Sequence, residues 1–227
     1  MTTVNDAPVL LLASASPRRR ELLALTGLNF QVAPAPVDET PQAGEPPETF
    51  ARRMSRAKAQ AAAQAAPRAN GAALLLAADT DVASGGRILG KPDSAAEARA
   101  MLRDLRGQTH QVVSAITLLN PATGRSLTDV ASTPVPMRDY SDQEIEDYIA
   151  TGDPFDKAGA YAIQHAGFHP VEHLAGCYAN VVGLPLCHLT RTLARLGVTP
   201  PRDVPAACQA HLGYDCPVYQ DVLEGRL

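Results

Sequence analysis

Short apolar runs alternate with longer amphipathic segments along most of the chain. The continuous runs VLLLA (9–13) and AALLLAADTDVA (72–83) are typical of strands buried on both faces of a sheet. The segment ETFARRMSRAKAQAAAQAA (48–66) instead has strong helix propensity and carries several cations. NFQVAPAP (29–36) predicts a further strand that ends in a proline-rich break. Alternating strands and helices indicate an α/β protein.

Turn and cap residues indicate where further elements begin. Ser84-Gly85-Gly86 predicts a hairpin between the second apolar run and RILGKP (87–92). The segments 109–119 and 126–140 flank the turn NPATG and predict a long antiparallel pair. Because hairpins interrupt the alternation, we predict a mixed β-sheet flanked by helices. Serine caps are predicted for three helices, at Ser16, Ser94 and Ser141.

The end of the chain carries weaker signals. The last clear helix is predicted over 182–197 (VGLPLCHLTRTLARLG), and the segment after it has no assignment. We therefore predict one domain over residues 1–198 and a C-terminal tail of unknown role over 199–227.

The composition is that of an ordinary globular chain. Of the 227 residues, 45% are hydrophobic and 19% charged, and the net charge is −4 at pH 7. With a pI of 5.8, the chain gives no indication of wholesale binding to nucleic acid or to an anionic membrane. No apolar run reaches the length of a membrane span, and MTTVNDAPVLLL lacks the basic region of a signal peptide. We expect a cytoplasmic protein.

The four cysteines all lie in the last third of the chain, at positions 177, 187, 208 and 216. Their spacing is irregular and contains no CxxC pair. Cytosolic thiols are therefore favoured over a zinc site completed by His188 and His211. A disulfide between Cys208 and Cys216 is an alternative that a reducing compartment disfavours.

Three arginines, 18 to 20, occupy the first turn of the helix predicted after Ser16. The helix dipole is positive at this end, so each exposed cation costs about 0.3–1 kcal/mol there. A bound anion reverses the sign, because backbone N–H groups and guanidinium groups then converge on it. The alternative is solvated arginines paired with Glu21, Asp38 or Glu39. We favour an anion site, since phosphates bind at strand-to-helix turns.

Asp79 stands at the end of the apolar run LLLAA, where open α/β sheets place their ligands. A carboxylate there can hold a divalent cation or activate a water molecule. An aspartate that merely starts a turn with Thr80 and Asp81 is the alternative. GGRILGK (85–91) matches part of a P-loop, but Pro92 stands where that motif needs a hydroxyl. Lys91 therefore remains only as a single cation near Asp79 in the sequence.

Other polar residues widen the set of candidates. Glu39 is a candidate metal carboxylate and Lys58 a phosphate contact, whereas the Gln164 amide suits the edge of a base; each is alternatively a surface residue. Ser14 and Ser16 lie outside a G-x-S-x-G elbow, which disfavours serine hydrolase chemistry. This set suits attack by water on a phosphoanhydride, because it combines cations from several segments with two carboxylates able to hold metal and includes no obvious nucleophile.

Seven segments together resemble the Maf (septum-formation) family of nucleoside triphosphate pyrophosphatases, over about residues 9–197. In order along the chain they are LASASPRRRELL, VDET, RRMSRAKA, AADTDVASGGRILGKP, LRGQTHQVVSAITL, DPFDKAGAYAIQ and NVVGLPL. The resemblance implies a mixed α/β fold with two lobes around a deep nucleotide-binding cleft. It also implies hydrolysis of a nucleoside triphosphate to monophosphate and pyrophosphate with Mg²⁺ or Mn²⁺, and a homodimer.

The resemblance also implies roles for individual residues. Asp79 resembles the base that activates the attacking water, and Glu39 with Asp79 the metal-associated acids. Arg18 and Arg19 resemble triphosphate clamps, whereas Arg20 lies beyond the motif. The further substrate contacts implied are Ser14, Ser16, Lys58 and Lys91.

Three residues resemble the specificity positions of the subgroup acting on dTTP and UTP, namely Arg18, Thr80 and Gln164. Asp81 departs from the family, which usually has an apolar residue there; it is either an extra metal ligand or an outward-facing side chain. The expected function is a dTTP/UTP pyrophosphatase that is also able to act on modified pyrimidine nucleotides. The alternative is a non-catalytic nucleotide-binding regulator linked to cell division.

Overall fold

The computed structural model describes residues 10–65 and 74–227. Its sheet has six strands in the order β2-β1-β3-β5-β6, with β4 paired to β3. β1 pairs in parallel with β2 and β3, whereas the β3–β4, β3–β5 and β5–β6 pairs are antiparallel. The predicted mixed sheet is thus confirmed. The strands are β1 (Leu10–Leu12), β2 (Phe30–Val32), β3 (Leu74–Ser84), β4 (Arg87–Leu89), β5 (Thr109–Leu119) and β6 (Ser126–Pro136).

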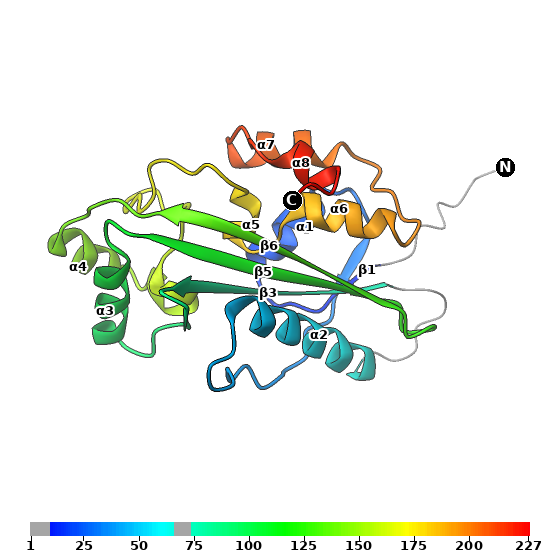
Figure 1. The fold of residues 1–227 in the computed structure, drawn as a ribbon, viewed down its shortest axis with the longest axis horizontal. Coiled ribbons are helices and arrows are strands. Elements are labelled where there is room, and N and C mark those ends of the chain that lie inside the picture. Colours follow the sequence, from blue (N-terminus) through cyan, green and yellow to red (C-terminus); the bar gives the residue numbers. More distant parts are fainter. Residues whose placement is uncertain (1–9, 66–73) are drawn as a thin grey trace.

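Helices cover both faces of the sheet (Figure 1). α2 (Pro47–Ala65) lies on one face, and α1 (Pro17–Ala24), α5 (Tyr178–Val182) and α6 (Leu186–Ala194) lie on the other. Beyond α6 lie α7 (Val204–Leu212) and α8 (Tyr219–Leu223), whereas α3 (Ala95–Leu105) and α4 (Asp142–Ala150) stand at the far end of the long strands. Two 3-10 turns, η1 (Asp153–Asp156) and η2 (Ala158–Ala160), connect α4 to the segment before α5. Among the described residues, none of these helices combines the length and apolar character needed to span a bilayer.

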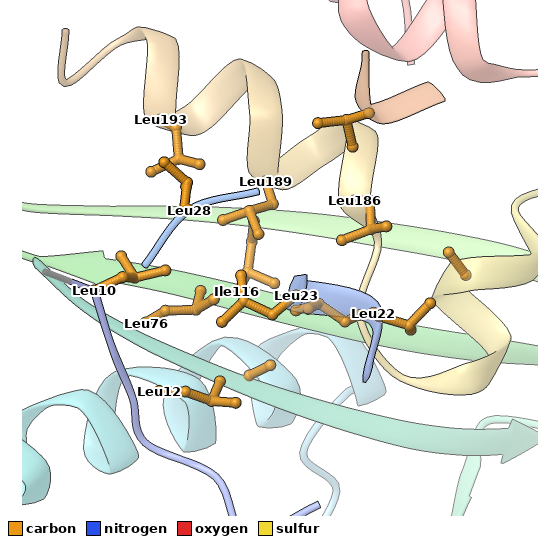
Figure 2. Packing of buried hydrophobic residues seen from close by; sticks show 14 of the residues in the cluster. Leu10, Leu12, Leu22, Leu23, Leu28, Leu76, Ile116, Leu186, Leu189 and Leu193 are labelled. Carbon is orange, nitrogen blue, oxygen red and sulfur yellow. The ribbon is translucent and has the colours of Figure 1, made fainter. Parts of the chain in front are cut away.

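The core consists of separate apolar clusters at the two ends of the long strands. Figure 2 shows the first, in which Leu12, Leu76 and Ile116 of the sheet pack beneath Leu189 of α6. The second surrounds Tyr140 and joins α3, α4 and the 3-10 turns to the far ends of β3 and β5. The chain therefore forms two packed regions joined by continuous strands, as expected for two lobes.

Local signals in the sequence identify the starts of three helices correctly. The side chains of Ser16, Ser94 and Ser141 cap α1, α3 and α4, and Glu144 completes a capping box on the last of these. The hairpin predicted at Gly85-Gly86 is confirmed, with φ of 56° and 77° at the two glycines. Four residues of predicted elements, Val9, Ala66, Ala72 and Ala73, lie outside the described residues.

Two predictions about the end of the chain are wrong. The helix predicted over 182–197 is divided, because Gly183 (φ 125°) and Pro185 separate α5 from α6. That helix is also not the last one, since α7 and α8 follow it. Asp203 caps α7, and Gly213 ends it in the left-handed conformation (φ 59°).

The strand predicted over 126–140 is shorter than expected, because β6 ends at Pro136. Beyond it, the backbone N–H of Arg138 donates to the carbonyl of Pro170 instead of to β5.

Candidate active site

One edge of β3 lacks a neighbouring strand in its middle, among the residues that the structure describes. β1 pairs with Leu74–Leu76 and β4 with Val82–Ser84, both on the edge opposite β5. Asp79, Thr80 and Asp81 lie in the interval between them. Because successive side chains of a strand point to opposite faces, Asp79 and Asp81 share one face and Thr80 has the other.

A cavity of about 620 Å³ opens at this interval and is lined by both lobes. The ten residues singled out from the sequence as site residues all line it: Ser14, Ser16, Arg18, Arg19, Glu39, Lys58, Asp79, Thr80, Lys91 and Gln164. They come from six separate stretches of the chain, so the fold has assembled them. The placement shows that the residues meet, and their individual roles stay predictions.

Arg19 is the most constrained of the three arginines. Its guanidinium donates to the carbonyl of Gly183 at 2.9 Å, to Thr80 Oγ1 at 3.0 Å and to Ser14 Oγ at 3.3 Å. Burial lowers the pKa of Arg19 below its usual value, and the nearby acidic side chains, Asp79 first, oppose that shift. The side chain thus closes the gap between α1, β3 and the end of α5.

The other two arginines differ from Arg19 in their surroundings. Arg18 lines the cavity and reaches Asp156 of η1 at 3.8 Å, with 30% of its side chain exposed. Arg20 is exposed, does not line the cavity, and has no ion pair or side-chain hydrogen bond in residues 10–65 and 74–227. The three successive cations therefore occupy three different environments.

Lys58 of α2 joins two carboxylates of the cavity wall. Its ammonium lies 2.6 Å from Asp79 Oδ1 and 2.9 Å from Glu39 Oε1. Asp79 is almost fully buried, with 7% of its side chain exposed, whereas Glu39 is 56% exposed. The phosphate contact predicted for Lys58 thus has two carboxylates as its present partners, and one N–H of the ammonium remains for a further acceptor.

Asp81 lies beside Asp79 and is itself buried, so the outward-facing alternative is wrong. Burial and the neighbouring Asp79 carboxylate raise the pKa of Asp81 to about 9. Asp81 therefore keeps its proton at neutral pH and donates it to Asp79. This explains why Oδ2 of each aspartate is buried without an N–H or hydroxyl partner.

The two remaining predicted residues are exposed at the cavity. Lys91 follows β4, next to Gly90, whose carbonyl accepts from Gly159 N at 3.0 Å. Gln164 lies three residues after Tyr161, and both line the cavity.

Thr80 has no free hydrogen-bonding capacity at the cavity. Its hydroxyl bonds to Ser114 Oγ at 2.8 Å and to the Gly183 carbonyl at 3.3 Å as well as to Arg19.

The sequence reasoning missed three residues that complete the wall, namely Asp156, Lys157 and Gly183. Lys157 is buried, and its ammonium bonds to Asp153 Oδ1 at 2.8 Å and to Asp156 Oδ1 at 2.5 Å. Gly183 supplies the carbonyl that holds Arg19. All three residues lie in segments quoted for the resemblance, DPFDKAGAYAIQ and NVVGLPL, which is the signal that could have found them.

The cavity is electropositive despite its acidic residues. Five cationic side chains line it against three carboxylates. The cations are Arg18, Arg19, Lys58, Lys91 and Lys157. A polyanion that enters this space would meet a net positive wall, with the buried carboxylate of Asp79 between the cations.

The oxygen donors suit a hard divalent cation. Asp79 and Glu39 already converge on the Lys58 ammonium, so the pair is arranged around a point of positive charge. Carboxylates are the ligands that Mg²⁺ and Mn²⁺ prefer, and one or two of them with substrate phosphates suffice for Mg²⁺. Among the described residues, no three His, Cys, Asp or Glu side chains form a metal site by themselves. A metal held here would need oxygens from a ligand.

The fold and the cavity define an α/β protein with a cationic cleft that holds a buried carboxylate. Residues 9–196 match the family described as Maf-like protein, and the chain belongs to that family.

The alignments with several named relatives span nearly the whole length of those proteins. The protein named dTTP/UTP pyrophosphatase from Thermomicrobium roseum is 50% identical over 88% of this chain and 91% of its own. Proteins of the same name from Anaeromyxobacter dehalogenans and Citrifermentans bemidjiense are 46% and 45% identical, over 88% and 83% of this chain and 100% and 95% of theirs. A solved nucleoside-triphosphatase / dITP/XTP pyrophosphatase from Mycobacterium abscessus matches at 18% identity over 82% of this chain and 93% of its own, with a TM-score of 0.38 that is too low to support an argument.

Proposed function

We propose that the protein hydrolyses dTTP and UTP to the nucleoside monophosphate and pyrophosphate, with modified pyrimidine nucleotides as further substrates. The observation that carries the proposal is a single buried carboxylate, Asp79, in the wall of a cavity lined mainly by cations. The relatives named dTTP/UTP pyrophosphatase support the choice of substrate.

Asp79 is the proposed general base. Lys58 fixes Oδ1 at 2.6 Å, and the buried Asp81 lies beside the same side chain. A carboxylate retains further lone pairs beyond these two contacts. It can therefore orient a water molecule in the cavity and take its proton as the water oxygen attacks phosphorus.

The cations of the wall are the proposed phosphate contacts. Arg19 uses three of its five N–H donors on the protein, which leaves two for phosphate oxygens. Arg18, Lys91 and the remaining N–H of Lys58 supply positive charge where the pyrophosphate leaves. Ser14 and Ser16 complete this phosphate-binding turn between β1 and α1.

Asp79 and Glu39 are the proposed holders of a magnesium or manganese ion. When bound together with substrate phosphates, the metal neutralises phosphate charge and favours attack at phosphorus. In that state Lys58 would have to give up part of its contact with the two carboxylates, which frees its ammonium for phosphate.

Thr80 and Gln164 are the proposed specificity positions together with Arg18. Thr80 acts through Arg19, because its hydroxyl is fully bonded within the wall. Gln164 is exposed in the cavity and offers both a donor and an acceptor, as the edge of a pyrimidine requires. The cytoplasmic homodimer implied by the resemblance also belongs to this proposal, and sedimentation of the purified protein tests its oligomeric part.

The test is a product assay with a panel of nucleoside triphosphates and Mg²⁺ or Mn²⁺. We expect pyrophosphate and monophosphate from dTTP and UTP. In Asp79→Asn, turnover should fall by about 10²–10⁴-fold, while the Kd for a non-hydrolysable dTTP analogue stays within about threefold. Asp104→Asn, in an exposed residue far from the cavity, is the matched control. Orthophosphate with diphosphate would overturn the reaction, and tight binding without turnover would indicate the regulator instead.

A further inference from the structure

All four cysteines of the chain line one small cavity beneath the C-terminal tail. They lie at separations of 10, 21 and 8 residues along the sequence and come from four elements. Cys177 is the N-cap of α5, Cys187 lies in α6, Cys208 in α7, and Cys216 in the turn before α8. Tertiary structure alone brings these thiols together.

The cavity among the four cysteines is small. Its volume is about 10 Å³, which is no more than one water molecule needs. Within the parts of the chain that the structure describes, which include every cysteine, no three His or Cys side chains are placed to bind a metal ion. The four cysteines are free thiols.

Two of the thiols, Cys177 and Cys216, lie in segments that hydrogen bonds of Tyr214 join to each other. Tyr214 anchors the turn by donating its hydroxyl to the carbonyls of Leu174 at 2.8 Å and Gly176 at 3.0 Å, directly before Cys177. The backbone N–H of Cys216 donates to Gln209 Oε1 at 2.9 Å. Cys177 and Cys216 line the same cavity, and their mutual contact is the largest cause of the pKa shift of each thiol.

The two thiols of this pair differ in reactivity. The hydrogen bond from Cys177 lowers the pKa of the half-buried Cys216, burial opposes that shift, and the N–H groups of Val218 and Tyr219 add to it. Contact with Cys216 and burial raise the pKa of Cys177. A lowered pKa favours the nucleophilic thiolate at Cys216, and a raised pKa favours the thiol at Cys177.

We propose that Cys177 and Cys216 form a peroxide-sensitive thiol pair whose disulfide fastens the C-terminal tail to the N-terminus of α5. The oxidant is hydrogen peroxide. The Cys216 thiolate attacks one peroxide oxygen, so an S–O bond forms, the O–O bond breaks and hydroxide leaves. The Cys177 thiol then attacks the sulfenic sulfur, and its proton leaves with the displaced hydroxide as water. Two thiols lose two electrons in all, and one peroxide becomes two waters.

The disulfide would act on a segment that also borders the large cavity. α5 runs from Cys177 to Val182, and Gly183 beyond it holds Arg19. Asn180 in its middle donates to the Val112 carbonyl and to Thr133 Oγ1, both at 2.9 Å. The bond would close a loop of the chain between residues 177 and 216 without moving the far end of α5. We expect it to raise Tm by about 5–10 °C in the oxidised protein.

The experiment titrates the reduced full-length protein with hydrogen peroxide. We expect two of the four thiols to disappear at about one equivalent of peroxide. Non-reducing peptide mapping should find the Cys177–Cys216 link, and dithiothreitol should reverse both the link and the Tm shift. A Cys208–Cys216 or Cys187–Cys208 link, a link between chains, or sulfinic acid without any disulfide would each overturn the proposal, as would four thiols that react at equal rates.

Four single variants separate the two roles. Cys216→Ser should abolish thiol loss at one equivalent, whereas Cys177→Ser should stop at a sulfenic acid on Cys216 that a cyclic dione traps. Cys187→Ser and Cys208→Ser are the matched controls, and both should still form the link. If Cys177→Ser does not fold, Cys177→Ala serves for the same trapping. A dione adduct on any cysteine other than Cys216 contradicts the assignment.

Discussion

Replacing Arg19 with alanine separates the structural from the functional part of the arginine turn. Arg19 bonds to Gly183, Thr80 and Ser14, and it also faces the cavity. Arg19→Ala therefore removes three protein contacts and one cation of the proposed phosphate site. We expect both the stability and the turnover of dTTP to fall.

The expected loss in the free energy of unfolding depends on which hydrogen bonds the partners of Arg19 retain in the variant. A hydrogen bond to a charged group contributes about 1.5–3 kcal/mol, and the full penalty applies only where a partner is left unsatisfied. Thr80 retains Ser114 at 2.8 Å, the Gly183 carbonyl retains Thr80 at 3.3 Å, and Ser14 retains the N–H of Ser16 at 3.2 Å. The expected loss in the free energy of unfolding is therefore about 2–4 kcal/mol rather than three full penalties. Loss of a preorganised phosphate contact should lower kcat/KM by about 10²–10³-fold.

The two neighbouring arginines are the matched controls. Arg20→Ala should change the free energy of unfolding by less than about 0.5 kcal/mol and leave kcat/KM unchanged, because Arg20 is exposed and lies outside the cavity. Arg18→Ala loses only a partly exposed ion pair at 3.8 Å, so we expect little loss of stability but weaker nucleotide binding.

Urea unfolding and pyrophosphate release measure the two effects on the same protein samples. The reasoning is refuted if Arg20→Ala loses as much activity as Arg19→Ala. It is also refuted if Arg19→Ala remains as stable and as active as the unsubstituted chain.

Two further predictions concern stability. Gly159→Ala should lower the free energy of unfolding by about 2–4 kcal/mol, because Gly159 has φ 68° and an added Cβ would lie 2.8 Å from Val82 Cγ1. The control Gly152→Ala should lower it by only about 1–2 kcal/mol, because Gly152 has φ 77° but no atom within 4 Å of the added Cβ. Equal losses for the two variants in urea melts would contradict this prediction. Burial lowers the pKa of both His110 and His188 to about 4, below the unfolded value near 6.5. The unfolded chain therefore binds more protons between these values, so stability should fall as the pH drops from about 6.5 to 4, by up to roughly 3 kcal/mol per histidine. Urea midpoints across this range check it, and His188→Gln should flatten the fall; a flat profile in the unsubstituted chain would refute it.

Signals that act over a few residues were readable from the sequence. Ser16, Ser94 and Ser141 cap their helices as expected, because a cap depends on one side chain and the backbone three residues later. The hairpin at Gly85-Gly86 is equally local. The start of α7 at Asp203 carries the same kind of local signal.

Contacts between distant segments could not be predicted in this way. Lys58 reaches Asp79 and Glu39, 21 and 19 residues away along the chain, and nothing in the local pattern specifies that both carboxylates share one ammonium. The division of the helix at Gly183 places a carbonyl beside Arg19, which lies 164 residues earlier. Such pairings follow from how helices pack on the sheet, and not from propensity.

By itself the sequence determined most types of element, three helix caps, one hairpin turn and a set of candidate site residues, because these depend on local backbone preferences and side-chain type. Only the tertiary structure decided the environment of each candidate. It buried Asp79 beside a protonated Asp81, divided three successive arginines among three surroundings, and gathered four dispersed cysteines under the tail. The physical reason is that charge, pKa and thiol reactivity depend on burial and on neighbours in space, which packing of the whole chain sets.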